Sequence, residues 1–166
     1  RPNDSGWYRV LFNALLGADG QPEFSKSKLG IITFNYDRSL EAYVHTRLQN
    51  TFGMDEATAA QVLAELPIVH VHGILGEYPA VPYQEACDPA ALLRISKKIR
   101  IIHELVDKDG KFCNSLFRRA SSMLRRTERI FFLGFGFHPD NIRRFRFFSA
   151  QNLEGKSVRV KRPGFD

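Results

Sequence analysis

Three apolar runs of strand type each stop abruptly at polar residues or glycines, and segments with helical patterns separate them. The runs are Leu29–Phe34, Ile68–Val71 and Ile130–Leu133, and they are followed by Asn35 and Asp37, by His72-Gly73, and by Gly134 and Gly136. Strands that are separated by helices, and too far apart for hairpins, indicate right-handed crossovers in a parallel sheet. The predicted fold is therefore α/β, with a Rossmann-like parallel sheet flanked by helices.

Polar side chains at these strand ends predict one shared ligand cleft, because ligands of open α/β sheets bind just beyond the carboxyl ends of the strands. Asn35 and Asp37 supply a carboxamide and a carboxylate, which can hold a ribose hydroxyl, an amide or an attacking water. The alternative is that one of them only caps the next helix, predicted over Ser39–Leu48. The spacing alone does not separate a cap from a ligand site.

The second strand carries a His-x-His-Gly pattern at its end. Alternation along a strand puts His70 and His72 on one face, which is also metal-ligand geometry, but no third ligand is evident nearby. His72, followed by Gly73, suits a general base near neutral pH, whereas a packed structural histidine fits His70 better. After the third strand, Gly134 and Gly136 would let backbone N–H groups approach a phosphate or ribose, although the GxGxxG fingerprint is incomplete.

Helical spacing predicts the remaining elements. An amino-terminal helix capped by Asp4 or Ser5 would bury one apolar face, and three further helices and a last strand follow. The predicted elements are Trp7–Leu16 with the face Trp7, Val10, Leu11, Ala14 and Leu15; Asp55–Leu66; a helix that starts at Asp88-Pro89 and carries Leu92, Ile95, Ile99, Ile102 and Val106; Asn114–Glu128; and the strand Ser157–Val160.

Composition narrows the function classes. The 166 residues, 43% of them hydrophobic, suffice for one domain with a core, and no apolar run approaches the ~20 residues of a membrane span. Cys87 and Cys113 belong to no CxxC pair, which excludes a four-cysteine zinc site and suits reduced thiols in the cytoplasm.

The net charge of +6 favours anionic partners, and arginines at 118–119, 125–126 and 143–146 could contact nucleic acid. The segment Ile142–Phe148 interleaves three of these arginines with phenylalanines, which could stack bases or cover a partner surface. A solvated helix face is the favoured interpretation of one-sided charge, and nucleic-acid binding stays open.

Taken jointly and in order, the three strand ends resemble the sirtuin-like NAD-binding domain. The motifs that carry the resemblance are Thr33-Phe34-Asn35-Tyr36-Asp37, His72-Gly73 and Phe132-Leu133-Gly134-Phe135-Gly136-Phe137. The closest match looks like the divergent bacterial branch found in anti-phage defence proteins and related NAD-consuming enzymes. The resemblance covers roughly Leu29–Ile142.

The resemblance implies a role for each matching residue. Asn35 would orient the nicotinamide ribose and the attacking water, Asp37 would hold the nicotinamide carboxamide, and His72 would act on the ribose hydroxyls. Gly134 and Gly136 match the turn beside the adenosine ribose and phosphates. Thr33 and Gly73 belong to the same NAD-binding motifs. Asn35 and His72 are thus the catalytic candidates, and no residue is assigned to a metal.

Two departures from the sirtuin pattern shape the functional expectation. The four-cysteine zinc module of sirtuin deacylases is missing, which disfavours protein deacylation and favours cleavage of NAD with water as acceptor. The amino-terminal strand with its Gly-Ala-Gly phosphate loop is also not found, because Gly17-Ala18-Asp19-Gly20 follows a helical pattern. Either the first β-α unit lies upstream, or this copy does not bind NAD in the usual way.

The expectation is therefore a single sirtuin-like domain over residues 1–166, or a fragment of one, that acts as an NAD glycohydrolase without zinc. The alternative is a non-catalytic sensor of NAD or ADP-ribose that regulates a partner domain or a homo-oligomer.

Overall fold

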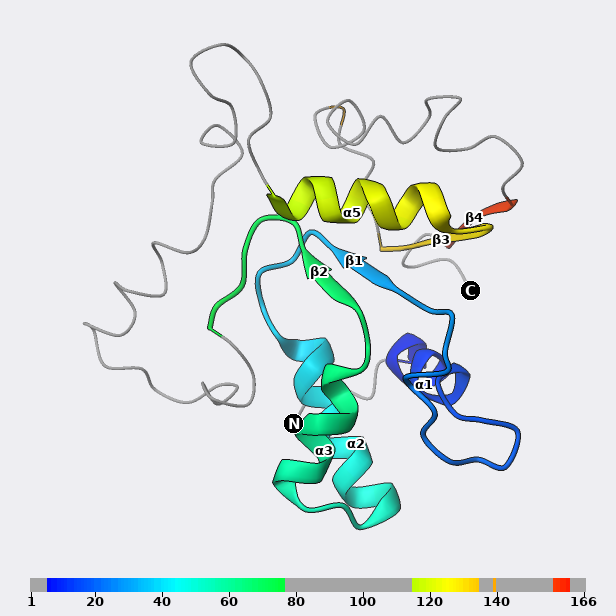
Figure 1. The fold of residues 1–166 in the computed structure, drawn as a ribbon, viewed down its shortest axis with the longest axis vertical. Helices are drawn as coiled ribbons and strands as arrows, with labels where there is room; N and C mark the ends of the chain where they lie inside the picture. Colours follow the sequence, from blue (N-terminus) through cyan, green and yellow to red (C-terminus); the bar gives the residue numbers. More distant parts are fainter. Residues whose placement is uncertain (1–5, 77–114, 135–138, 140–156, 162–166) are drawn as a thin grey trace, which may run out of the picture. The chain divides into compact units, whose positions relative to one another are not determined.

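The computed structural model describes residues 6–76, 115–134, 139 and 157–161, which fall in two compact units divided after Phe112. The first unit holds α1 (Gly6–Ala14), β1 (Ile31–Thr33), α2 (Ser39–Phe52), α3 (Glu56–Ala64) and β2 (Ile68–His70), and the second holds α5 (Ser115–Arg126), β3 (Arg129–Leu133) and β4 (Ser157–Lys161) (Figure 1). Among the described residues, the first unit has two parallel strands with three helices, and the second has two parallel strands with one helix. The predicted α/β class is confirmed, with sheets of two strands in the described residues.

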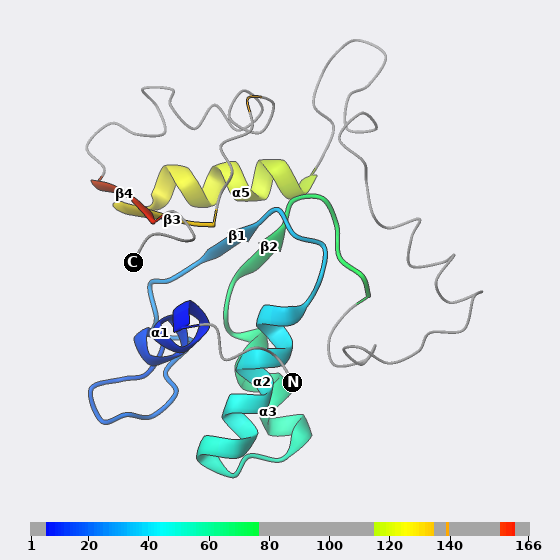
Figure 2. The same ribbon diagram turned by 180° about the vertical axis from the view of Figure 1, so that it is seen from behind.

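In the first unit, β1 and β2 pair in parallel, with Ile31 beside Ile68 and Thr33 beside His70 (Figure 2). The chain crosses from β1 to β2 through α2 and α3, as the spacing of the apolar runs predicts. The pairing continues past the strands, because the Val71 N–H donates to the Thr33 carbonyl at 3.0 Å. Both strands therefore leave the sheet at the same edge, and the residues that follow them begin side by side.

The crossover helices begin and end at recognisable signals. α2 runs one turn further than predicted and ends at Gly53, whose φ of 66° suits glycine and whose N–H donates to the Gln49 carbonyl. α3 is capped by Asp55, which accepts the Thr58 N–H at 2.7 Å, so the predicted cap is confirmed. That hydrogen bond lowers the pKa of Asp55.

The core of the first unit joins α1 and the loop after it to α2 and α3. Its buried members are Phe12, Leu15, Phe24, Leu40, Tyr43, Val44, Leu48, Ala59, Leu63 and Leu66. Figures 1 and 2 show α2 and α3 side by side. Since α2 contributes to this core from Leu40 to Leu48, it is the central helix of the unit.

The predicted apolar face of the amino-terminal helix is wrong in part. Trp7 is 41% exposed and Val10 66% exposed, whereas Leu15 of the same predicted face is 2% exposed and Leu11 packs against the core. Phe12, which the prediction did not place on that face, is 1% exposed. The helix carries two overlapping apolar stripes, and the one that includes Tyr8 and Phe12 packs against the core. Helical spacing alone allows either stripe, and contacts with α2 decide between them.

In the second unit, β3 and β4 pair in parallel from Arg129 with Ser157 to Leu133 with Lys161. The buried residues of α5 are Phe117, Ala120 and Leu124, and its exposed residues include Arg118, Arg119, Arg125 and Arg126. The predicted solvated arginine face is thus confirmed for this helix. β3 alternates in the same way, with Ile130 and Phe132 buried between exposed neighbours.

Several predicted features lie outside the described residues. They are the Asp4 or Ser5 cap, the helix that starts at Asp88-Pro89, Gly136, and the basic-aromatic segment Ile142–Phe148.

Candidate functional site

The loops after β1 and β2 form one corner at the carboxyl ends of these strands. The His70 Nδ1–H donates to the Asn35 carbonyl at 2.8 Å, and the Leu75 N–H donates to the Tyr36 carbonyl at 3.0 Å. The Phe34 and His72 rings meet edge to face with their centroids 5.7 Å apart. The structure therefore brings the Asn35–Asp37 motif and the His72-Gly73 motif together.

Asn35 presents an exposed side chain from a backbone that is held on both sides. Its N–H donates to the Thr33 Oγ1 at 3.1 Å, and its carbonyl accepts the bond from His70. Thr33, predicted to contact the cofactor, here uses its hydroxyl to fix the turn of its own chain. The backbone of Asn35 makes the bonds that hold this turn, so the Asn35 carboxamide can bind a ligand.

Asp37 accepts two hydrogen bonds from Ser39, the first residue of α2, with one of its two oxygens. Its Oδ1 accepts the Ser39 N–H at 2.9 Å and the Ser39 hydroxyl at 2.5 Å. Because that hydroxyl donates to the carboxylate, Tyr8 must be the donor in its 2.7 Å bond to Ser39 Oγ. Among the described residues, no hydrogen bond engages Asp37 Oδ2. The N-cap position of α2 is Arg38, so Asp37 does not cap this helix, but its bonds to Ser39 fix the carboxylate and leave one oxygen for a ligand.

His72 is held in place by packing and by the turn that follows it. It is 9% exposed and lies against the edge of Phe34. Gly73 is also buried and has a φ of 90°, a conformation that side chains other than glycine rarely adopt. The Gly73 N–H donates to the His70 carbonyl at 3.1 Å, which closes the turn. This turn ends β2 and fixes where the His72 ring leaves the strand.

His70 forms a buried pair with Glu41 from the first turn of α2. Both side chains are more than nine-tenths buried, and His70 Nε2 lies 2.5 Å from Glu41 Oε1. The expectation that His70 is a packed structural histidine is confirmed. Glu41 was not predicted from the sequence, although an acidic residue within the apolar stretch Leu40-Glu41-Ala42-Tyr43-Val44 is a usable signal, since buried carboxylates need a partner.

The surroundings of His70 change its pKa in opposite directions. Burial of the ring lowers the pKa, but the hydrogen bond and charge of Glu41, the Asn35 carbonyl and the charge of Asp37 together raise it above its usual value. These surroundings therefore favour the charged imidazolium form of His70.

A raised pKa in the folded state predicts a pH-dependent stability. The contribution of His70 is complete below its unfolded pKa of about 6.5 and is lost as the pH rises through the folded pKa. We expect the difference in unfolding free energy between the wild-type protein and His70→Gln, measured in urea, to narrow from about pH 6 to about pH 9. A difference that stays constant or widens over this range would contradict the prediction.

The two glycines predicted to line the adenosine end of the cleft fall elsewhere in the chain. Gly134 follows β3 in the second unit with a φ of 61°, and Gly136 lies outside the described residues. The predicted site residues that the structure brings together in the first unit are Thr33, Asn35, Asp37, His72 and Gly73.

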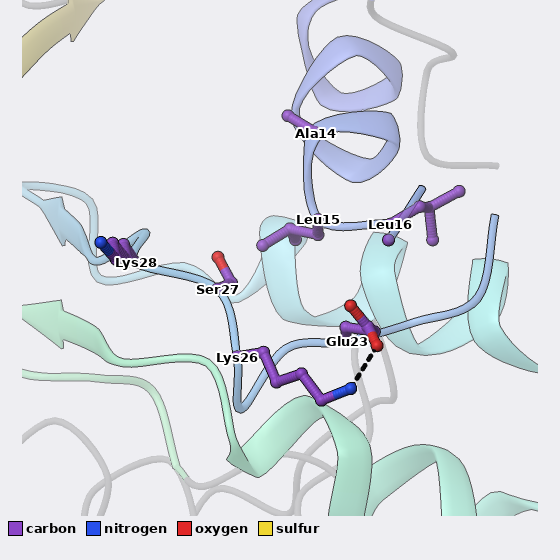
Figure 3. A pocket seen from close by; sticks show the side chains of 8 residues that line it. Ala14, Leu15, Leu16, Glu23, Lys26, Ser27 and Lys28 are labelled. Carbon is purple, nitrogen blue, oxygen red and sulfur yellow. Dashed lines mark hydrogen bonds and ion pairs between the residues drawn. The ribbon is translucent and has the colours of Figure 1, made fainter. Parts of the chain in front are cut away.

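A hollow of about 250 Å³ lies before β1 rather than after it, and Ala14–Gly17, Glu23 and Lys26–Lys28 line it (Figure 3). Lys26 pairs with Glu23 there, and this bond raises the lysine's pKa. The Gly17 and Gly20 N–H groups donate within their own tight turn, which follows a helix. Because it follows a helix and its two glycine N–H groups donate within the turn, this turn differs from a phosphate loop, which follows a strand and points its N–H groups at the ligand.

Within the part of the chain that the structure describes, no three His, Cys, Asp or Glu side chains gather in a way that could hold a metal ion. No described helix combines the length and the apolar character that crossing a membrane requires.

Comparison with known proteins identifies the family. The family model of the SIR2-like domain matches residues 29–160, which include β1, β2, β3, all of β4 but its last residue, and every predicted site residue. No curated protein matches the chain, and no solved structure does. Because the model covers most of the sequence, the chain belongs to the SIR2-like domain family, whose members generally bind NAD.

Proposed function

We propose that this domain binds NAD at the corner after β1 and β2 and hydrolyses it to nicotinamide and ADP-ribose. The observation that carries the proposal is the junction of the Asn35 and His72 motifs at the carboxyl ends of two paired parallel strands. Ligands of α/β sheets bind at this position. Family membership supplies the ligand class.

The side chains of the corner suit the nicotinamide–ribose end of NAD. The exposed Asn35 carboxamide can orient a water molecule, and the Asp37 carboxylate keeps one oxygen for the nicotinamide amide. His72 has the donor and acceptor capacity to bind ribose hydroxyls and to act as a base. A carboxamide, a carboxylate and an imidazole are the groups that binding and cleaving the nicotinamide–ribose end of NAD would require.

The reaction breaks the bond between C1′ and the nicotinamide nitrogen, and the electron pair leaves with nicotinamide. C1′ develops oxocarbenium character, the water held by Asn35 forms the new C1′–O bond, and its proton passes to a base. Asn35 and His72 therefore have the two chemical roles, and Asp37 has a binding role. Water as the acceptor makes this a glycohydrolase rather than a zinc-dependent protein deacylase.

The remaining assignments extend the proposal through the family resemblance. Gly134 and Gly136 would form the turn beside the adenosine ribose and phosphates. A Rossmann-like parallel sheet and a single domain over residues 1–166 belong to the same proposal. Membership of the bacterial anti-phage branch, with a partner domain or a homo-oligomer, belongs to the same proposal.

The test is to incubate the purified full chain with NAD and to quantify nicotinamide and ADP-ribose by chromatography, with calorimetry of both nucleotides alongside. Release of both products supports the hydrolase. Binding without release would select the sensor. The sensor is favoured by one observation, that the turn Gly17–Gly20 is not a phosphate loop. If neither binding nor release occurs, both are rejected, and retention on DNA that falls steeply with salt would select a nucleic-acid function.

A further inference from the structure

We propose that Glu41 and His70 are positioning residues: Glu41 holds His70 in the protonation form that grips the Asn35 carbonyl, and this grip fixes the direction in which the Asn35 carboxamide points. The kinetic part of this inference rests on the proposed hydrolase function. Its structural part does not, because the state of the His70 ring can be measured without NAD.

The hydrogen bonds of the ring decide where its protons lie. The Asn35 carbonyl can only accept, so His70 Nδ1 must carry a proton in the 2.8 Å bond. His70 Nε2 then either donates to an ionised Glu41 or accepts from a protonated one across 2.5 Å. Both arrangements keep Nδ1 protonated. Without a partner at Nε2, the ring could move its proton there, and Nδ1 would then face the carbonyl with a lone pair.

The Glu41–His70 pair, together with the bond from His70 to the Asn35 carbonyl, connects three elements of the first unit. Glu41 comes from α2, His70 from β2, and Asn35 from the loop after β1. The other described bond to the Asn35 backbone comes from Thr33, two residues back in the same strand end. His70 therefore provides the only described bond from another element to the Asn35 backbone.

Stability alone explains this pair poorly. Burying an ion pair costs desolvation that its attraction often fails to repay. Glu41 Oε2 adds to that cost, since it is buried and has no hydrogen-bond partner among the described residues. A buried pair with an unsatisfied oxygen is better explained by its effect on geometry, because it holds the His70 ring against the Asn35 carbonyl. The charged groups that raise the pKa of His70, Glu41 on α2 and Asp37 after β1, keep the ring protonated for this purpose.

The test compares Glu41→Ala, which breaks the pair, with Glu41→Gln, whose amide can still donate to Nε2 of a neutral ring protonated at Nδ1. Long-range ¹H–¹⁵N spectra of the full chain report which ring nitrogen of His70 carries a proton. We expect Nδ1 to stay protonated in the wild type and in Glu41→Gln. In Glu41→Ala we expect the proton to move to Nε2 and the Asn35 amide signal to shift. Glu65→Ala, which removes a carboxylate bonded to the Ser25 N–H elsewhere in the unit, is the control and should leave both signals unchanged.

The kinetic readout separates positioning from a general loss of structure. Glu41→Ala should lower kcat for nicotinamide release by about tenfold to a hundredfold, because a small displacement of a reacting group is enough for such a loss. KM should stay within about threefold, and Glu41→Gln should recover most of the rate. If Glu41→Ala does not fold, Glu41→Met fills the space without a hydrogen bond and takes its place.

Two results would overturn the proposal. One is a His70 ring that keeps its Nδ1 proton, with an unmoved Asn35 amide, after Glu41 is removed. The other is a folded Glu41→Ala protein with wild-type kcat. A wild-type protein that does not cleave NAD would reject the proposed function alone, since the spectra would still decide the state of His70.

Discussion

Asn35→Ala and His72→Ala are each expected to reduce nicotinamide release by about 10²–10⁴-fold, the usual range for removing a group that assists proton transfer or positions a reactant. Both side chains would act mainly on the transition state, Asn35 through the attacking water and His72 through the ribose. The loss should therefore fall on kcat, with a smaller change in KM. Initial rates of nicotinamide formation across a range of NAD concentrations measure both constants.

Matched variants distinguish these roles from a loss of fold. Asn13→Ala removes an exposed carboxamide from α1, and Tyr36→Phe removes a half-exposed hydroxyl beside Asn35. Both should keep near-wild-type kcat. Asp37→Asn is informative in a different way, since it keeps an oxygen that can accept the Ser39 N–H but removes the charge, so KM should rise more than kcat falls. Activity that survives both Asn35→Ala and His72→Ala would reject the catalytic assignment.

The strand ends were the part of this protein that its sequence could predict. β-Branched, continuously apolar runs are typical of strands buried in a parallel sheet, and they stop where polar residues begin. The predicted pairing of these runs through crossovers agrees with the parallel register of Ile31 with Ile68. A parallel pair places both following loops at one edge. The meeting of the Asn35 and His72 motifs thus follows from topology, without knowledge of any single contact.

Contacts between elements could not be predicted in this way. The bond from His70 to Glu41 joins residues 29 positions apart, and its partner atoms meet only because the fold brings the first turn of α2 to the end of β2. Likewise, Tyr8 reaches Ser39 across 31 positions. Periodicity describes one element at a time, so it cannot say which polar side chain another element will supply. The sequence also left open whether Asp37 caps the next helix or binds a ligand, because both functions occupy the same place in a sequence.

Phe12→Ala should lower the unfolding free energy by about 3–5 kcal/mol, the usual cost of truncating a fully buried phenylalanine. The Phe12 ring is 1% exposed, lies 6.4 Å from the Phe52 ring between centroids, and receives the Arg47 guanidinium at 5.7 Å. Its removal would leave a cavity between α1 and α2 and would also take away the surface on which Arg47 rests. Because single domains unfold at about 5–15 kcal/mol, this one change could remove a large part of the stability.

Val10→Ala, on the same helix, provides the matched comparison. Val10 is 66% exposed, so its truncation should change the unfolding free energy by no more than about 0.5 kcal/mol. Urea denaturation of both variants measures the difference directly, and a large effect at Val10 with a small one at Phe12 would mean that the other stripe of α1 faces the core. Phe12 and Tyr8 both precede residue 29, where the family match begins. A large loss at Phe12 would therefore establish α1 as part of the folded unit that carries Asn35 and His72, and would connect it through Tyr8 and Ser39 to the Asp37 carboxylate.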